Sequence, residues 1–508
     1  MGKTRPGRIT GMDGMPEISK TCKVTVAIKG VAPRVWCPWI ALGLLWGAAI
    51  HAASVESPRA TQESPLVSTC QGDQSVQVVE LPWTVSQALN LQPRLLIAHA
   101  DEQASRSEVD AAKGAFLPQI NLSAVDERYV PSNGNMPVVV VGNTVLGGAQ
   151  INSAYASLGL TWNLWNNGRD LAALRGARAD VRSAGYGVDA QRSDTLLGVL
   201  KAYAELYEAE IGAKADVQAA IDLKAIEARA EERYARGYGT EVAIGQARVA
   251  ALHAEQTSND ACRDLEDKSA ALAQAVGTEL GSAHGLRTLQ TLPRPRPGVD
   301  ARSMEALIDA NPAVEEAEES VTAAQSALRR ARGEYGPTLA LTFQRDFLGQ
   351  DPDSIAFANR HLAAADYRVG LQLTVPLFPF NAPRADVTKA RAQLDKAQAS
   401  YHQARLEAQT KLLGALSTRR AAEKSFEAAD SNLAEAEKVL ALTEAQFRAG
   451  RQDRDAVEHA KMDRDTARAD RERFETERAL AEWMAERAEL PQQFPDMLLR
   501  QLDSPGER

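Results

Sequence analysis

The sequence has few cysteines, few aromatic residues and no long apolar run. Its four cysteines, at positions 22, 37, 70 and 262, are too few for a disulfide-rich scaffold. In an exported chain Cys70 and Cys262 can either form one bridge or stay reduced, and we expect two free thiols. Aromatic residues make up only 5% of the chain, which is little for a large mixed core. Because no apolar run approaches the roughly 20 residues of a transmembrane helix, a bundle of such helices is excluded.

Motifs of catalysis and of metal binding are also missing. The chain contains no His-Glu-x-x-His pair, no Walker phosphate loop and no Gly-x-Ser-x-Gly elbow, and its seven histidines are scattered. We therefore expect no enzyme, no catalytic residue, no cofactor and no metal site. A net charge of -9 also makes the chain a poor partner for nucleic acid, since phosphate contacts need a basic face.

The N-terminal residues follow the pattern of a secretory signal. Seven basic and two acidic side chains within residues 1–34 precede an apolar run at 39–50, which ends at small residues. This order of basic, apolar and small residues is typical of an export signal, and the run is too short to span a membrane. We predict a signal peptide at 1–52, with a buried N-terminal helix as the alternative.

An internal duplication predicts two structural repeats. Residues 113–118 (KGAFLP) correspond to 332–337 (RGEYGP), 219 positions later, and residues 233–237 (RYARG) correspond to 446–450 (QFRAG), 213 positions later. The difference of six residues falls between 122 and 158, in a loop. The predicted division is a signal peptide at 1–52, an N-terminal linker at 53–82, a first repeat at 83–290, a Pro-rich linker at 291–301, a second repeat at 302–490 and a C-terminal tail at 491–508.

Each repeat contains one very long predicted helix. A pattern rich in Ala, Leu, Glu, Arg and Lys continues from Gly168 to Gly237, and again from Pro383 to Gly450. Each helix would have about 65 residues and a length of roughly 100 Å. Such helices need neighbours along their sides, and frequent alanines indicate close helix approach. Taken alone, the helices favour an ordinary soluble coiled-coil hairpin.

Four segments alternate between apolar and polar residues and predict strands. They lie at 120–123, 158–164, 339–344 and 371–377. Such alternation suits either a half-buried soluble sheet or a membrane barrel, and aromatic residues near the segment ends favour the barrel. The residues predicted to face lipid are Leu158, Leu160, Trp162, Leu164, Leu339, Leu341, Phe343, Leu371, Leu373 and Val375.

Four strands are too few to close a barrel within one chain. A membrane barrel leaves no unpaired edge, and the smallest barrels have eight strands. The barrel must therefore be shared between copies: two chains would give eight strands and a plugged interior, whereas three would give twelve and a channel.

With these features the sequence resembles the TolC family of outer-membrane efflux and secretion ducts, from about residue 83 to 490. The resemblance rests on residues 111–120 (AAKGAFLPQI), 158–165 (LGLTWNLW) and 233–237, together with their copies in the second half. It implies a mostly α fold with membrane β: a homotrimer whose duplicated protomers each give four strands to a shared 12-stranded β-barrel and long helices to a periplasmic α-barrel. It further implies an outer-membrane location with a large periplasmic portion.

The resemblance also implies partners and a cargo. The partners are a periplasmic membrane-fusion adaptor, an inner-membrane ABC transporter and the lipid of the outer membrane. Within the family the chain is most similar to ducts that secrete an adenylate cyclase-haemolysin toxin, which implies type I secretion of an RTX-type protein. Small-molecule efflux is the alternative, and a periplasmic coiled-coil adaptor without a pore is a more distant one, because the duplication argues against it.

The family closes its tunnel just after the helix turns, which here are marked by Gly237 and Gly450. We assign both glycines to helix ends, and the resemblance makes these turns the place where an adaptor docks. The family's gate positions fall on Ala456 and His459, with companions at Val242 and Ala243, so its acidic gate is not reproduced. The acidic or titratable residues nearby, which we predict to line the pore entrance, are Asp453, Asp455, Glu458, His459 and Glu241.

A substitute acidic ring is one interpretation of these residues, and a solvated helix face is the other. In the first interpretation Asp455 and Glu458 narrow the entrance and disfavour anions, as acidic rings do in cation-preferring pores.

Overall fold

The computed structural model describes most of the chain after the predicted leader. The described residues are Cys70 and residues 75–129, 139–141, 144–146, 151–278, 284–288, 291–295, 303–351, 354–378 and 381–503. The predicted signal peptide lies outside them. All described residues belong to one compact unit, Pro58–Arg508, and the account below concerns this unit alone.

Three pairs of helices follow the predicted duplication. The pairs are α3 (Pro93–Gly114) with α7 (Pro312–Gly333), α4 (Arg169–Ala235) with α9 (Asn381–Arg448), and α5 (Glu241–Val276) with α10 (Arg454–Glu489). The two members of a pair are nearly equal in length: 22 residues each for α3 and α7, 67 and 68 for α4 and α9, and 36 each for α5 and α10. The predicted duplication and the two very long helices are confirmed.

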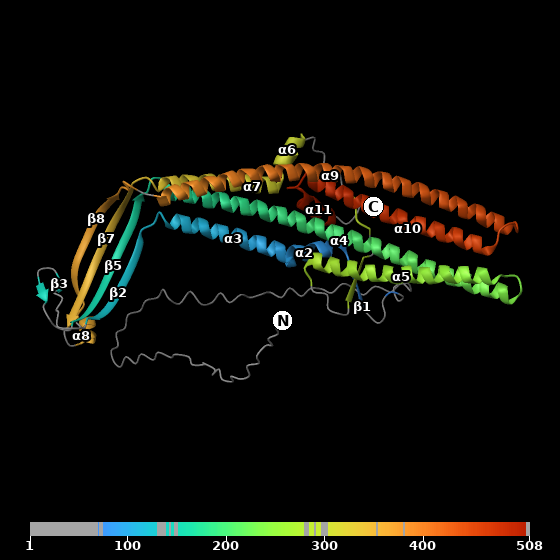
Figure 1. Cartoon of the computed structure of the whole chain (residues 1–508), viewed down its shortest axis with the longest axis horizontal. Helices are drawn as coiled ribbons and strands as arrows, with labels where there is room; N and C mark the ends of the chain where they lie inside the picture. The colour runs from blue at the N-terminus through green and yellow to red at the C-terminus, as the bar shows by residue number, and fades with distance from the viewer. Residues whose placement is uncertain are drawn as a thin grey trace, which may run out of the picture. The chain divides into compact units, whose positions relative to one another are not determined.

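One antiparallel sheet collects the four predicted strands. Its order is β2 (Gln119–Tyr129), β5 (Ile151–Trp165), β7 (Thr338–Asp351) and β8 (Ala363–Thr374). Each repeat thus supplies one pair of neighbouring strands, and β5 joins β7 across the two repeats. Figure 1 shows this sheet at one end of the long helices, with the α4–α5 and α9–α10 turns at the other end.

Smaller elements complete the unit. They are α2 (Leu81–Leu91), α6 (Met304–Asp309), α8 (Ile355–Arg360), α11 (Phe494–Asp503), the parallel pair β1 (Ser75–Val79) and β6 (His284–Thr288), and the hairpin of β3 (Val139–Val141) with β4 (Thr144–Leu146). Three consecutive valines, at 139–141, therefore supply one strand of the β3–β4 pair. Among the described residues, no helix combines the length and apolarity that a membrane crossing requires.

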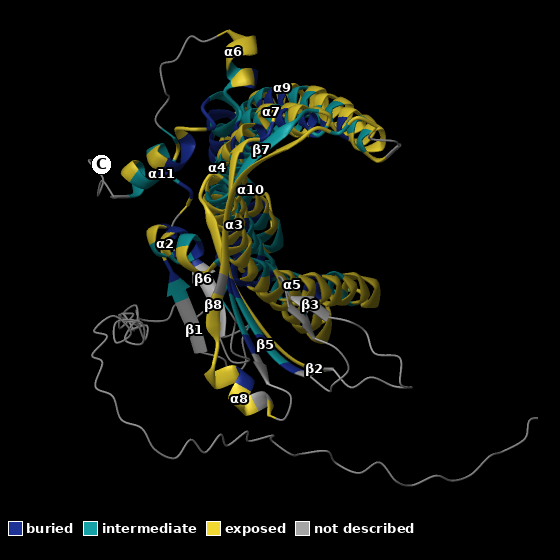
Figure 2. Cartoon of the chain, turned by 90° about the vertical axis from the view of Figure 1, so that its left-hand side faces the viewer, coloured by how far each residue is buried: buried dark blue, intermediate teal, exposed yellow. Residues whose placement is uncertain are grey.

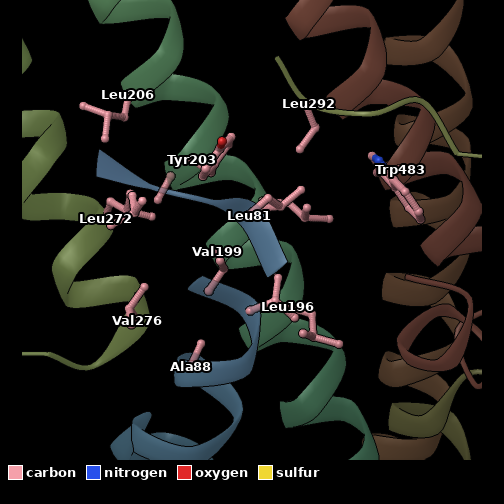
Figure 3. Packing of buried hydrophobic residues seen from close by; sticks show 14 of the residues in the cluster. Leu81, Ala88, Leu196, Val199, Tyr203, Leu206, Leu272, Val276, Leu292 and Trp483 are labelled. Carbon is pink, nitrogen blue, oxygen red and sulfur yellow. The ribbon is translucent and has the colours of Figure 1, made fainter. Parts of the chain in front are cut away.

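The main core surrounds the middle of α4. Leu196 and Tyr203 of α4 and Trp483 of α10 are almost fully buried there (Figure 3). Leu200 of α4 and Phe494 of α11 belong to the same buried cluster. The indole nitrogen of Trp483 donates a hydrogen bond to the Pro293 carbonyl oxygen at 2.7 Å, which satisfies the polar end of this large side chain. Burial of each such side chain contributes about 1.5 to 3 kcal/mol, so this cluster holds α10 and α11 against the middle of α4.

Away from this core, the long helices pack through small residues. Four buried alanines of α9, at positions 408, 415, 422 and 429, follow one another at intervals of seven residues. A heptad interval keeps one face of a helix against its neighbour, and alanine lets the two backbones approach closely. The close helix approach predicted from the alanine content is confirmed for this seam.

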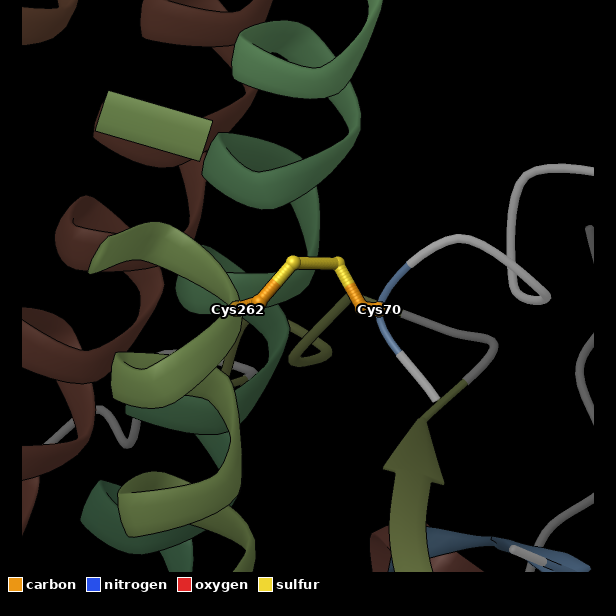
Figure 4. The surroundings of a disulfide bond; sticks show 2 residues. All are labelled: Cys70 and Cys262. Carbon is orange, nitrogen blue, oxygen red and sulfur yellow. A yellow bond between two sulfur atoms is a disulfide. The ribbon is translucent and has the colours of Figure 1, made fainter. Parts of the chain in front are cut away.

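The expectation of two free thiols is wrong. Cys70 and Cys262 form a disulfide bond, with their Cα atoms 5.3 Å apart (Figure 4). Cys262 lies within α5, and the chain before β1 is brought to this helix because β1 pairs in parallel with β6. The cysteines are separated by 192 positions, so no local pattern in the sequence indicates that they meet.

Candidate functional site

One face of the four-stranded sheet is lined with apolar side chains in register. Ile120 of β2 lies opposite Leu160 of β5, which lies opposite Phe343 of β7, which in turn lies opposite Val369 of β8. Residues that lie directly opposite one another point to the same face of a sheet. The alternation seen in the sequence therefore produces an apolar row across all four strands, although Arg345 lies on the same face, opposite Leu158.

The predicted lipid-facing residues differ in exposure. The exposed ones are Leu158, Trp162, Leu164, Leu371, Leu373 and Val375, and the partly buried ones are Leu160, Leu339, Leu341 and Phe343. The three on β7 are partly buried and those on the edge strand β8 are exposed, whereas β5, which like β7 has a neighbouring strand on each side, carries residues of both kinds. That this face contacts lipid stays a prediction, which the apolar rows support.

The opposite face of the sheet carries a polar cluster around Asp346. Tyr155 and Arg368 each donate a hydrogen bond to the Asp346 carboxylate at 2.6 Å, and Gln344 donates one at 2.9 Å. The three donors come from β5, β7 and β8, so the cluster ties three strands together. An apolar face backed by a polar face is the pattern of a barrel wall with lipid outside and water inside.

The turns at the far end of the long helices are built alike in the two repeats. Gly237 and Gly450 have φ of 84° and 70°, the left-handed conformation that closes a helix and that glycine adopts without strain. The next helices begin with equivalent caps: Thr240 accepts a hydrogen bond from the backbone N–H of Ala243, and Asp453 from that of Ala456. These four residues shape the turns of two hairpins, α4–α5 and α9–α10.

A salt bridge joins the two hairpins near these turns. Arg229 Nε of α4 donates to Asp455 Oδ1 of α10 at 3.0 Å, and Arg233 Nη2 donates to Asp455 Oδ2. We call Arg229, Arg233 and Asp455 the latch. Burial raises the pKa of the Asp455 carboxyl, but hydrogen bonds from Arg233 and Arg229 lower it by more, so this pKa lies below its usual value. Asp455 is therefore ionised at neutral pH.

The spacing of charges along α4 explains how one helix binds two neighbours. Arg248 of α5 contacts Glu227 and Glu231 of α4, at 2.9 and 2.6 Å. Glu227 and Glu231 are one helical turn apart. Arg229 and Arg233 each follow one of them by two residues, so the arginines lie about 200° around the helix from the glutamates. One face of α4 is thus fastened to α5 and the opposite face to α10.

The five predicted entrance residues do not form a free acidic cluster within one chain. Asp455 is held by the latch, and Glu458 lies between Arg454 and Lys461 at 3.7 and 3.6 Å. Asp453 caps α10, and its carboxylate is 3.9 Å from Arg233. His459 and Glu241 are exposed. The acidic ring stays a prediction, whereas the positive partners of Asp455 and Glu458 were missed in the sequence.

The signal that identifies the latch arginines is present but weak. Arg229 and Arg233 lie one helical turn apart in the last two turns before Gly237, where basic residues also complement the helix dipole. Their common partner Asp455 is more than 200 residues away, and only the packing of α4 against α10 brings it near. Of the positions that correspond to the family's gate, Val242 is 69% exposed and Ala456 contributes its backbone N–H to the α10 cap.

A groove lies beside the same turn on the first hairpin. Its volume is about 660 Å³, and it is lined by Leu223 of α4 and by seven residues of α5: Val242, Gly245, Gln246, Val249, Ala250, His253 and Ala254. Val242 and Val249 are 69% and 68% exposed. An apolar groove with exposed valines at its rim is suited to receive another apolar surface.

Sequence and structure comparisons decide the family. The profile of the family described as "Outer membrane efflux protein" matches residues 84–278 and 304–483. The chain belongs to the outer membrane efflux protein family. The match covers both repeats, and it sets aside the alternative of a periplasmic adaptor without a pore. No curated protein matches the chain by sequence.

Solved structures share this fold at low sequence identity. The CmeC outer membrane channel of Campylobacter jejuni superposes with a TM-score of 0.68 at 18% identity, covering 80% of this chain and 85% of that one. A membrane protein from Pseudomonas aeruginosa gives 0.65 at 19% identity, over 85% and 99% of the two chains. CusC gives 0.64 at 18% identity, over 80% and 91%.

The family fixes the architecture in which the apolar sheet face and the latch are placed. The fold is that of a trimeric β-barrel joined to an α-barrel, with each chain giving four strands and its long helices. The protein is an outer-membrane channel with a large periplasmic tunnel. Family members are ducts without enzymatic activity and work with an adaptor and an inner-membrane transporter.

Proposed function

We propose that this channel is the outer-membrane duct of a type I secretion system, which passes an exported protein, such as an RTX-type adenylate cyclase-haemolysin toxin, from the cytoplasm to the exterior. The resemblance of the sequence to toxin-secreting ducts supports the protein cargo, and the latch supports a duct that opens and closes, whatever it carries. The latch fastens α4 to α10 by charged groups at the end of the helices away from the sheet, so the hairpins can separate without breaking the apolar core around Leu196 and Trp483.

A polar latch suits a duct that opens for a large cargo and closes again. Partly exposed ion pairs contribute little net stability, because water compensates both charges when the pair separates. Separation of an apolar seam would instead expose its side chains to water, at about 25 cal/mol for each Å². The turns at Gly237 and Gly450 keep each hairpin intact while the two hairpins move apart, and they offer the surface on which an adaptor docks.

Small-molecule efflux is the second candidate, and the family description favours it. The matching family is named for efflux. The same tunnel and latch would serve this function without change, since a duct in series with a transporter leaves the choice of cargo to the transporter.

The two functions are separated by deleting the gene in its host and restoring it on a plasmid. Protein secretion predicts that one large protein disappears from the culture medium and returns on complementation, while susceptibility to toxic compounds stays unchanged. Small-molecule efflux predicts that the secreted proteins stay unchanged, while the deletion makes cells more susceptible to toxic compounds and complementation restores their resistance. Complementation with an Asp455→Asn variant tests the latch in either case, because a leaky duct sensitises cells to antibiotics that the outer membrane normally excludes.

A further inference from the structure

The duplication relates the latch to a second contact, which one chain cannot make by itself. The helix ends and turns of the two repeats correspond at a constant offset of 213 positions, from Gly237 to Gly450. On this offset α4 corresponds to α9, and α10 corresponds to α5. The contact of α4 with α10 within a chain therefore has a counterpart between α9 of one chain and α5 of the next.

A threefold assembly of duplicated chains requires this counterpart. Three chains place six repeats around one axis, with first and second repeats in alternation. Every first repeat meets the second repeat of its own chain through α4 and α10. Every second repeat then meets the first repeat of the neighbouring copy, and the corresponding helices are α9 and α5.

The residues at the counterpart positions have the opposite chemistry. Asp455 corresponds to Val242, Arg229 to Leu442, and Arg233 to Gln446. A charged triad within the chain is thus replaced by two apolar residues and an amide.

The exposure of these residues shows which face lacks its neighbour in a single chain. The Asp455 side chain is 13% exposed and that of Arg229 is 27% exposed. Their counterparts Val242 and Leu442 are 69% and 63% exposed. Much of α5 and α9 is coloured as exposed in Figure 2.

We infer that the groove beside Val242 is the seat of α9 from a second copy of this chain, with Leu442 packed against Val242. The groove lies on α5 where the corresponding face of α10 carries Asp455 and Glu458. Gly245 occupies the position that corresponds to Glu458, and nothing within 4 Å would meet a Cβ there, which leaves space for an incoming side chain. Val439, one turn before Leu442 on α9, is 51% exposed and extends the apolar surface.

We call the end of the tunnel formed by the turns at Gly237 and Gly450 the tip, and each contact between the helices of neighbouring repeats a seam. Seams of two kinds then alternate around the closed tip. Three charged seams lie within chains and three apolar seams lie between chains. Because the charged seams separate at the lower cost, the moving body at the tip consists of α4–α5 of one chain and α9–α10 of its neighbour. This inference rests on the trimeric fold of the family and is independent of the cargo.

Paired cysteines test the seam directly. The double variant Val242→Cys with Leu442→Cys, oxidised in the full-length trimer, is expected to give a covalent trimer on a non-reducing gel, which collapses to single chains after reduction. The matched control is Arg229→Cys with Asp455→Cys, which joins two sites of one chain and leaves its mass unchanged. Each single variant gives at most covalent dimers, because a closed ring of three needs two different cysteines per chain.

The outcome is decisive because both positions are exposed in a single chain, so the substitutions leave its core intact. Size-exclusion chromatography of the same samples verifies the trimer before oxidation. A verified trimer in which the cysteines at positions 242 and 442 remain unlinked would contradict the proposed contact between α5 of one chain and α9 of the next. So would an intramolecular link between them, detected by mass spectrometry of the peptides from single-chain bands.

Discussion

Arg229 and Asp455 are 226 positions apart in the sequence, yet their side chains meet at 3.0 Å. One comes from the end of the first long helix and the other from the beginning of the last long hairpin helix. Their contact exists only if α4 and α10 are packed side by side. The pair therefore reports directly on whether the two hairpins of a chain are closed.

Replacement of Asp455 by asparagine should open the channel more often. The variant keeps the size of the side chain but removes the charge that binds Arg229 and Arg233, and leaves two arginines facing each other. Partly exposed ion pairs contribute about 0.2 to 1 kcal/mol each, so the loss of each contact corresponds to a shift of about 1.4- to 5-fold in the closed-to-open equilibrium. Single-channel recordings in planar bilayers measure this shift as increased open probability.

Asp453→Asn is the matched control for the latch. This residue lies on the same turn, but asparagine caps a helix as well as aspartate does, and the distance from Asp453 to Arg233 is 3.9 Å. The control should behave like the unmodified protein. An equal effect of the two substitutions would show that the general charge of the turn, rather than the latch, keeps the channel closed.

The sequence was sufficient for local structure and insufficient for long-range pairing. Alternation at 371–377 predicted β8, and the uninterrupted helical pattern between Gly168 and Gly237 predicted α4, because each follows from neighbouring residues. The Cys70–Cys262 bond and the partners of Asp455 depend on which distant segments lie side by side. That information is in the packing of α4 against α5 and α10, and no local periodicity encodes it.

Glu208 should make the stability of the protein depend on pH around neutrality. Burial, the largest cause, raises the pKa of its carboxyl to about 7; Glu477 and Glu205 raise it further, while Arg473 and Lys268 lower it. Between pH 4.5 and about 7, the Glu208 carboxyl is therefore protonated in the folded state and ionised in the unfolded chain. The associated stability is complete below the unfolded pKa near 4.5 and is lost as the pH rises to about 7.

Glu208→Gln removes this titration and should stabilise the protein by about 1 to 2 kcal/mol at pH 8, a value reduced for solvent screening. The gain should disappear below pH 4.5, where the carboxyl of the unmodified protein is protonated in both states. Thermal unfolding of both proteins across this range measures the difference. Exposed Glu437 on α9 provides the control, since Glu437→Gln makes the same chemical change on the surface and buries no carboxyl.

Removal of the disulfide should destabilise the protein. The bond closes a long loop between Cys70 and Cys262, and it restricts the unfolded chain, which typically contributes about 2 to 4 kcal/mol. The double variant Cys70→Ser with Cys262→Ser should unfold at a lower temperature. A reducing agent should lower the unfolding temperature of the unmodified protein to the same value and leave the variant unaffected. Identical unfolding of oxidised and reduced protein would argue against any stabilising role of the bond.

Two neighbouring residues of β8 test which face of the sheet contacts lipid. Leu371 lies opposite Leu341 in an apolar row, whereas Gln372 lies opposite Ala340 on the other face. An arginine on the lipid side of a barrel costs about 2 to 4 kcal/mol near the middle of the membrane, and a polar substitution on the water-filled side costs little. Leu371→Arg should therefore reduce the amount of assembled trimer in outer-membrane fractions, while Gln372→Arg should assemble normally. If Gln372→Arg assembled poorly and Leu371→Arg normally, the two faces would have to be exchanged, and Asp346 with its partners would then face lipid instead of the channel.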